Sequence, residues 1–171
     1  MKNLILLTIV ALIAFGCGNG SDTSTSSTTA TSEKEAPAKE ESATTTDDGE
    51  VKLEIAGNDQ MQFDKKELKV KAGQKVTLTL THTGEMAMEV MGHNFVLLKQ
   101  GTDLAAFSND AINAKDNDYI PESDAIIVHT KMLGGGETDT ITFDAPEKGT
   151  YDFVCTFPGH YALMQGKFIV E

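Results

Sequence analysis

The sequence predicts an all-β domain over residues 51–171, a sandwich of short antiparallel strands with one helical insertion. Several segments in this range alternate apolar and polar residues with a period of two, which is typical of strands with one buried face. Turn signals separate these segments, and many short strands in about 120 residues favour a Greek-key arrangement. The hydrophobic share of 40% supplies enough apolar surface for a packed core, so a fully disordered chain is excluded.

The alternating segments predict five strands in chain order: 51–55, 76–81, 141–143, 151–155 and 168–170. The second is the clearest, because Val76, Leu78 and Leu80 share one face and threonines occupy the other. Turns are expected where glycine or proline falls between the strands, at 71–74 and 146–149.

One segment has helical spacing instead. Between Asp103 and Ala114, apolar residues recur at helical spacing: Leu104, Phe107, Ala111 and Ile112. A short helix that connects two strands is therefore expected here.

The first sixteen residues have the pattern of an export signal. Lys2 precedes an apolar stretch from Leu4 to Phe15 that only Thr8 interrupts. Twelve helical residues span roughly 18 Å, which is well short of the roughly 30 Å hydrocarbon core of a bilayer. Residues 1–16 are therefore predicted to be a signal peptide rather than an anchor helix, and the chain is expected to be exported.

The signal ends in Ala14-Phe15-Gly16-Cys17, which resembles the lipobox of bacterial lipoproteins. In that family the cysteine thiol is diacylated and becomes the new N-terminus. The resemblance implies that Cys17 is lipidated and anchors the protein to a membrane, facing the periplasm or the cell exterior. The alternative is an ordinary signal peptide that is cut nearby and leaves Cys17 as a free thiol.

Residues 17–50 are predicted to be a lipidated cysteine followed by a disordered tether. Serine and threonine make up 14 of the 29 residues from Ser21 to Gly49, and residues 18–50 contain no Val, Ile, Leu or aromatic residue. Such a segment buries too little apolar surface to offset its backbone entropy. As a flexible coil, 33 residues reach roughly 30 Å, which suits a spacer between a lipid and a domain.

The net charge is −12, and all 14 basic residues are lysine. A protein that binds nucleic acid normally presents a basic face with arginine, so we exclude that class.

The residues that carry chemistry are one cysteine, two histidines and one methionine. Cys155, His160 and Met164 lie within ten residues at a strand end, and His93 precedes another apolar strand. Two imidazoles and a thiolate, with a weak axial thioether, form the donor set of blue-copper electron-transfer sites. The constellation predicts one copper ion.

Other interpretations fit single residues of this set. A cysteine at a strand end is often a small core residue, and Met164 and His93 alone are compatible with structural roles. A Cys/His nucleophile pair would not require His93 or Met164. A structural zinc site is also possible in principle, although thioether is a poor zinc ligand.

Longer motifs resemble azurin, a small cupredoxin, over essentially all of residues 51–171. The matching stretches are Gly57–Phe63, Val90–Asn94, His129–Lys131, Cys155–His160 and Ala162–Met164. The resemblance implies an eight-stranded Greek-key β-sandwich, cupredoxin-like, with the helix outside.

The resemblance also implies the roles of individual residues. His93, Cys155 and His160 would be equatorial copper ligands and Met164 a distant axial one. The Gly92 carbonyl would approach from the opposite side, and Asn94 would tie the two ligand loops together by hydrogen bonds.

The chain departs from azurins at two places. Val51 and the Ala72-Gly73-Gln74 turn stand where azurins have a disulfide, and Phe95 replaces a buried tryptophan. Neither change touches a ligand. His82 corresponds to a partly buried histidine of some azurins, and His129 is expected at the surface without a metal.

The resemblance also implies a docking patch around the edge of His160. Its residues are Met61, Met86, Met91 and Phe157, and Met88 lies nearby in the sequence. A methionine-rich apolar surface suits weak and fast contact with redox partners.

Together these features predict a monomeric type 1 copper protein that shuttles single electrons between membrane-associated or periplasmic redox proteins, such as c-type cytochromes, oxidases or reductases. The alternative is a protein that binds and delivers copper without acting as an electron carrier. An enzyme is not expected, because a thiol oxidoreductase would need a second nearby cysteine.

Overall fold

The computed structural model describes residues 44–45 and 49–171. The predicted signal peptide, Cys17 and nearly all of the predicted tether therefore lie outside the described residues. The elements follow in this order: β1 (Thr44–Thr45), β2 (Glu50–Asn58), β3 (Gln62–Phe63), β4 (Glu67–Val70), β5 (Lys75–His82), α1 (Met88–Met91), β6 (Val96–Leu98), α2 (Leu104–Asn113), the 3₁₀ turn η1 (Lys115–Asn117), β7 (Ile126–His129), β8 (Thr138–Asp144), β9 (Gly149–Val154) and β10 (Gln165–Val170).

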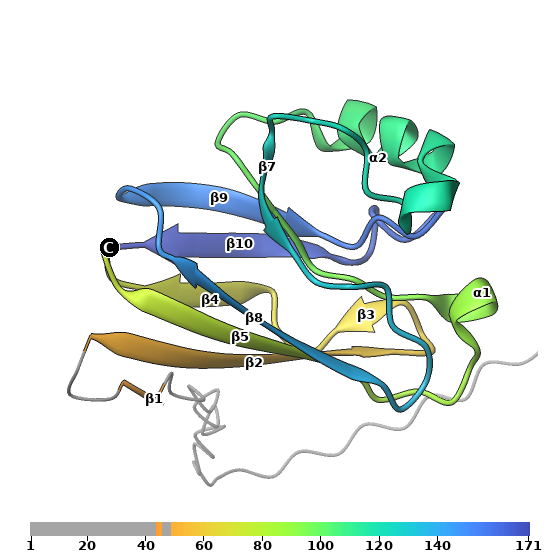
Figure 1. Ribbon diagram of the computed structural model, residues 1–171, viewed down its shortest axis with the longest axis horizontal. Helices are drawn as coiled ribbons and strands as arrows, with labels where there is room; N and C mark the ends of the chain where they lie inside the picture. The colour runs from red at the N-terminus through yellow and green to blue at the C-terminus, as the bar shows by residue number, and fades with distance from the viewer. Residues whose placement is uncertain (1–43, 46–48) are drawn as a thin grey trace, which may run out of the picture. The chain divides into compact units, whose positions relative to one another are not determined.

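The strands form two sheets that face each other (Figure 1). One sheet has the order β1-β2-β5-β8, with β3 paired to β2, and the other has the order β4-β10-β9-β6-β7. The pairs β2–β5 and β4–β10 are parallel and the remaining pairs are antiparallel. Eight of the described strands have three or more residues, which confirms the predicted eight-stranded sandwich.

The period-two pattern determines which face of the first sheet is buried. Leu53 and Leu78 are paired across β2 and β5, and both lie in the core between the sheets. On the outer face, threonines of β5 meet threonines of β8, as Thr79 and Thr140 do with their hydroxyl oxygens 3.0 Å apart. Cross-strand pairs of this kind stabilise the register.

The predicted helix is α2, and it lies on the outer side of the second sheet (Figure 1). Its N-cap Asp103 accepts hydrogen bonds from the backbone N–H groups of Ala105 and Ala106. Phe107 packs into a small outer cluster with β6 and β9 residues, which explains why β6 is buried on both faces. The Ile112 side chain is 48% exposed, because it lies about 100° around the helix from its buried neighbour Ala111.

Two further features were not apparent from the periodicity. Strand pairing begins at β1, where Thr44 lies opposite Lys52 of β2. Thr44 is seven residues before the predicted start of the domain. The one-turn helix α1 lies just before His93 and none of its residues is buried. Among the described residues, no helix is both long and apolar enough to cross a bilayer.

The ends of the strands bring the histidine and sulfur-containing side chains to one end of the sandwich. Gly57, near the end of β2, is paired with His82, the last residue of β5. At the same end of the sandwich, β9 leads into Cys155 and β10 begins just after Met164.

Candidate metal centre

Three of the four predicted ligands lie in one loop that is closed by its own backbone. The Cys155 N–H donates to the Met164 carbonyl at 2.9 Å, and the Met164 N–H donates to the His160 carbonyl at 2.8 Å. The His160 N–H in turn donates to the Phe157 carbonyl at 3.0 Å. Gly159 has a φ of 83°, a conformation that favours glycine and lets the loop turn. The loop therefore directs its ligands to one place.

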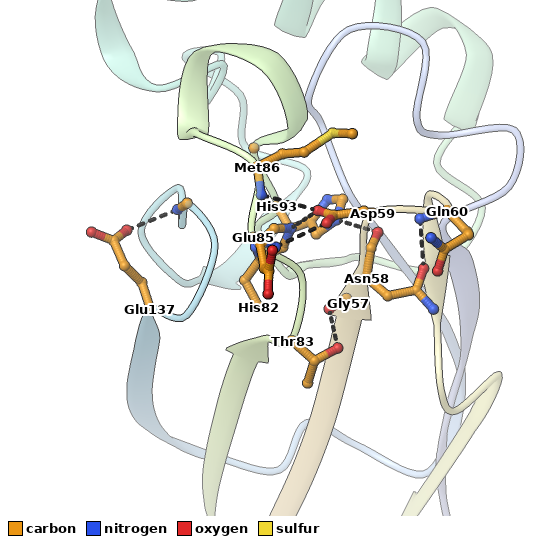
Figure 2. A network of polar contacts seen from close by, with 12 residues as sticks. Gly57, Asn58, Asp59, Gln60, His82, Thr83, Glu85, Met86, His93 and Glu137 are labelled. Atoms are coloured by element: carbon orange, nitrogen blue, oxygen red, sulfur yellow. Dashed lines mark hydrogen bonds and ion pairs between the residues drawn. The ribbon is translucent and has the colours of Figure 1, made fainter.

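His93 reaches the same place from a distant part of the chain. Its backbone forms an isolated antiparallel bridge with Leu133, with N–H to O distances of 3.0 and 2.8 Å. Its ring Nε2 lies 2.8 Å from the Asn58 carbonyl oxygen, so Nε2 carries a proton and donates to that oxygen (Figure 2). The ring Nδ1 is buried and has no hydrogen-bond partner. A neutral imidazole held in this way leaves its Nδ1 lone pair free for a metal.

The ligand atoms of His93, Cys155 and His160 all lie within 4.8 Å of one another, and all three residues are buried. Cys155 Sγ is 3.7 Å from His160 Nδ1 and 3.8 Å from the Gly92 carbonyl oxygen. Metal–donor bonds are shorter than these donor–donor separations, so one ion placed among the donors could bond to all of them. The thiol and two imidazoles, together with the buried unpartnered nitrogen of His93, fit copper.

Gly57 shows how closely the site is packed, and sequence reasoning assigned it no role. A Cβ at this position would lie 2.8 Å from Cδ2 of His93 and 3.2 Å from the Met164 methyl carbon. The end of β2 therefore lies directly against the His93 ring and the Met164 thioether. Met164 itself is fully buried. The neighbouring Asn58 carbonyl, which orients His93, was likewise missed, because a backbone acceptor leaves no signature in a side-chain pattern.

Burial sets the protonation states of the ligands when no metal is bound. Removal from water raises the pKa of the Cys155 thiol to about 11, although hydrogen bonds from the Asn94 and Phe157 backbones partly oppose this. Burial lowers the pKa of His160 to about 4, and it also lowers the pKa of His93. At neutral pH the site thus holds two neutral imidazoles and a protonated thiol, so a metal ion that binds there displaces one proton.

Asn94 joins the two ligand segments. Its side-chain Nδ2 donates to Thr156 Oγ1 at 2.7 Å, and its Oδ1 accepts from the Thr156 N–H at 2.8 Å. Both residues are buried, so this reciprocal pair links the residues adjoining His93 and Cys155.

A polar network surrounds the far side of His93 (Figure 2). The His82 ring lies behind it, with ring centroids 4.3 Å apart, and His82 Nε2 is 3.7 Å from Asp59 Oδ1. Asp59 also accepts hydrogen bonds from the Glu85 and Met86 N–H groups at 2.9 and 3.4 Å. The Glu85 bond is the main reason that the pKa of Asp59 is lowered. The network attaches the turn after β2 to the segment that precedes α1.

The residues of the predicted docking patch differ in exposure. Met86 is 43% exposed, whereas Met61, Met91 and Phe157 are half-buried. His160 is only 3% exposed, so little more than an edge of its ring reaches the surface. The Phe157 ring lies against it, with centroids 4.7 Å apart.

Two further residues that the sequence analysis singled out, His129 and Phe95, are not copper ligands. His129 is exposed, and its Nδ1 lies 2.9 Å from the Thr130 carbonyl oxygen. Phe95 is fully buried and stacks on Phe153, with centroids 5.1 Å apart. The phenyl ring thus fills the core where azurins have an indole.

Comparison with protein families gives a match over the whole described domain. A family model described as copper binding proteins, plastocyanin/azurin family, matches residues 49–171. The chain is 50% identical over 123 residues to Azurin-1 of Alcaligenes xylosoxydans xylosoxydans, which covers 68% of this chain and 95% of that protein. It is 46% identical over 118 residues to Outer membrane protein H.8 of Neisseria gonorrhoeae, covering 66% of this chain and 63% of that protein.

Solved structures agree with these matches. Reduced auracyanin from Roseiflexus castenholzii superposes with a TM-score of 0.64 and 44% identity, over 70% of this chain and 96% of that one. Auracyanin A from Chloroflexus aurantiacus, described as a "blue" copper protein, gives a TM-score of 0.65 and 40% identity, over 71% of this chain and 99% of that one.

Proposed function

This chain belongs to the plastocyanin/azurin family of copper-binding proteins, and from that premise we propose how it carries electrons beside a membrane. It is a type 1 copper electron-transfer protein with one copper at His93, Cys155, His160 and Met164. Members of the azurin family are electron carriers rather than enzymes, so this chain catalyses no bond chemistry of its own.

The observation that supports the function best is the convergence of three buried donors. His93 Nδ1 has no hydrogen-bond partner, and a ring nitrogen of His93 lies within 4.8 Å of the ligand atoms of Cys155 and His160. A buried nitrogen without a partner costs free energy in a metal-free protein. Bound copper supplies an ion that is stable as both Cu(I) and Cu(II), and therefore a place to hold or release one electron.

The protein itself holds the ligands in fixed positions and excludes water from them while the charge of the site changes. The Asn94–Thr156 pair joins the two ligand segments, and the Asn58 carbonyl orients the His93 ring. Burial of Cys155 and Met164 excludes water from the sulfur atoms. A site that reorganises little between its two charge states exchanges electrons at low cost.

Two weaker donors would complete the copper site. One is the Met164 thioether, which is fully buried and whose methyl carbon lies beside Gly57, as the His93 ring does. The other is the Gly92 carbonyl oxygen, which lies 3.8 Å from Cys155 Sγ. Both are weaker donors to copper than thiolate or imidazole.

Electrons enter and leave through the docking patch of Met61, Met86, Met91 and Phe157 around the His160 edge. This placement is supported by the 43% exposure of Met86 and by the contact of Phe157 with the His160 ring. Apolar patches of modest size suit transient contact, and we propose c-type cytochromes or membrane-bound oxidases and reductases as partners of a monomeric carrier.

A lipid on Cys17 and a tether between Cys17 and β1 keep the copper domain near the membrane. The lipobox-like end of the signal supports this proposal, as does the similarity to a protein named for the outer membrane. A single attachment point with a flexible spacer raises the effective concentration of the domain at membrane partners.

The copper function is tested by Cys155→Ser in the copper-loaded protein. The intense visible absorption of a type 1 site originates in charge transfer from the thiolate sulfur, so the variant should lose it while the apo domain stays folded. Retention of the intense band in Cys155→Ser would overturn the assignment of Cys155.

The tether is tested by deleting residues 21–42, which leaves Cys17 and β1 in place. The spectrum should remain unchanged, whereas electron transfer to partners in reconstituted vesicles should slow, because the shortened chain restricts how the docking patch turns towards them. Equal rates in the two forms would mean that the tether length has no role in transfer.

A further inference from the structure

Methionine is concentrated at the copper end of the domain. The described residues contain six methionines, and none of them lies in a strand: Met61, Met86, Met88, Met91, Met132 and Met164. Met164 is a copper ligand. The copper site itself does not require the other five thioethers at this end of the domain.

Three of the five follow one another within six residues, in a stretch that we call the methionine segment, residues 86–91. Met88 and Met91 are the first and last residues of α1, so they are three positions apart and lie on the same side of this single turn. Met86 is 43% and Met88 36% exposed, and Met91 is half-buried. The segment thus presents thioethers to solvent at adjacent positions.

The charges in the same stretch favour a cation. Glu85 and Glu89 are exposed beside the thioethers, and no lysine occurs between Thr83 and Leu98. Carboxylates raise the local concentration of cations, and thioether sulfur is a soft donor that selects Cu(I) over harder ions.

The backbone at the start of the segment is held in place. The Met86 N–H donates to Asp59 Oδ1 at 3.4 Å, and the Met86 carbonyl accepts from the Gly135 N–H at 2.8 Å. Figure 2 shows the Met86 side chain extending away from this network of polar contacts. Side chains that project from a fixed backbone lose less freedom when they bind a common ion.

The methionine segment continues directly into the copper site through Gly92. A Cβ on Gly92 would lie 2.7 Å from the Met88 carbonyl oxygen and 2.9 Å from Met132 Sδ. The Gly92 carbonyl is itself 3.8 Å from Cys155 Sγ. A further thioether, that of Met132, is 6% exposed and lies beside Gly92, the residue that joins the methionine segment to His93.

We propose that Met86, Met88 and Met91 form a second metal site, which captures Cu(I) at the surface and passes it to Cys155 and the two histidines when the protein is loaded. The transfer is an exchange of ligands without a redox step. Bonds from Cu(I) to thioether sulfur break, bonds to the Cys155 sulfur and to imidazole nitrogen form, and the thiol proton leaves to solvent. The capture step is independent of the electron-carrier function, and only the transfer rests on it.

The capture site is tested with Ag(I), a redox-inert ion that has the charge of Cu(I) and its preference for thioethers. Ag(I) is titrated into the reduced copper-loaded protein, and the methionine methyl groups are followed by ¹³C NMR. The methyl signals of Met86, Met88 and Met91 should shift saturably at one Ag(I) per chain, while those of Met61 and Met164 stay in place. Shifts that do not saturate, or that appear only at Met164, would overturn the proposal.

Two variants separate the capture site from an unspecific effect of thioethers. Met86→Leu/Met88→Leu preserves side-chain volume and should weaken Ag(I) binding at least tenfold. Met61→Leu removes a thioether from the same end of the domain but outside the segment, and should leave binding unchanged. Equal binding in the double variant and the unmodified protein would contradict the proposal.

The transfer step is tested by loading the apo protein from a Cu(I)–bicinchoninate complex, whose colour reports the copper that remains. Loading of the Met86→Leu/Met88→Leu variant should be several-fold slower, whereas its loading with Cu(II) should be unchanged, because Cu(II) has little affinity for thioethers. Equal rates of Cu(I) loading in the variant and the unmodified protein would exclude the transfer. An intense visible band after Cu(II) loading would show that the copper site itself is intact in the variant.

Discussion

The two segments that supply the copper ligands are stabilised in different ways. The loop from Cys155 to Met164 holds its three ligands with hydrogen bonds inside ten residues, such as that from the Cys155 N–H to the Met164 carbonyl. His93 is held entirely by distant parts of the chain, through its bridge to Leu133 and the bond from its ring to the Asn58 carbonyl.

This difference shows that the site has a locally determined half and a half that depends on the whole sandwich. A ligand in the first half keeps its geometry as long as the loop folds. The position of His93 requires β2 and the loop around Leu133 to be in register. Changes at the connection between the halves should therefore have the largest effects, and changes at a single weak donor the smallest.

Asn94→Ala should have the largest effect, because it separates the two halves. The substitution leaves the buried Thr156 N–H and hydroxyl without partners, at a cost of about 2–4 kcal/mol in the free energy of unfolding. Denaturant unfolding of the apo protein measures this cost. Asn117→Ala removes one side-chain bond to the Ile120 carbonyl, away from the ligands, and is the matched control. Similar losses in the two variants would mean that Asn94 does not join the segments.

Gly57→Ala should perturb the His93 half most, because the added Cβ would lie nearer to the His93 ring than to the Met164 methyl carbon. The added methyl group would lie 2.8 Å from the His93 ring, and overpacking of this kind costs about 1–3 kcal/mol. Copper affinity should fall and the visible spectrum should change. Gly73→Ala, at a turn with a φ of 77° and no atom within 4 Å of the added Cβ, strains the backbone but should leave the spectrum unaltered. An unchanged spectrum in Gly57→Ala would show that His93 tolerates movement.

The pH dependence of apo-protein stability should report on both halves. The pKa of His160 falls from 6.5 in the unfolded chain to about 4 in the folded one, and the pKa of His93 is also lowered. Between these values the unfolded state binds more protons, so the free energy of unfolding should decrease as the pH falls from about 6.5 towards 4.

Above neutral pH, Cys155 is the copper ligand whose ionisation should change the stability of the apo protein. The pKa of Cys155 rises from 9.0 to about 11 on folding, so the unfolded thiol ionises first and the free energy of unfolding should decrease as the pH rises from 9 to 11. Thermal unfolding across the pH range should thus give maximal stability between about 6.5 and 9. Cys155→Ser should remove part of the alkaline decrease and leave the acid side unchanged. A flat profile would contradict the inferred burial.

Met164→Leu should have the smallest effect on folding and on the colour of the site. The axial thioether is a weak donor, so the variant should still bind copper with an intense visible band. Loss of this donor and a drier site both disfavour Cu(II), so the reduction potential should rise, which a redox titration measures. Met61→Leu, outside the ligand set, should leave the potential unchanged. A fall in the potential of Met164→Leu would argue against the axial assignment.

The sequence alone determined the parts of this protein that depend on near neighbours. The period-two pattern of Val76, Leu78 and Leu80 predicted β5 and its buried face, and the spacing of Cys155, His160 and Met164 predicted a closed ligand loop. The helical spacing of Leu104, Phe107 and Ala111 likewise predicted α2. In each case the side chains that must meet lie within about ten residues, so local geometry decides whether they can.

Only the tertiary structure decided what surrounds His93. The pairing of Gly57 with His82 across β2 and β5 brings the Asn58 carbonyl and a residue without a side chain to the ligand ring. A backbone oxygen and a missing Cβ have no hydrophobic period or charge to reveal them in the sequence. Their role depends on contacts between residues 35 or more positions apart, and these form only when the sheets have paired and packed.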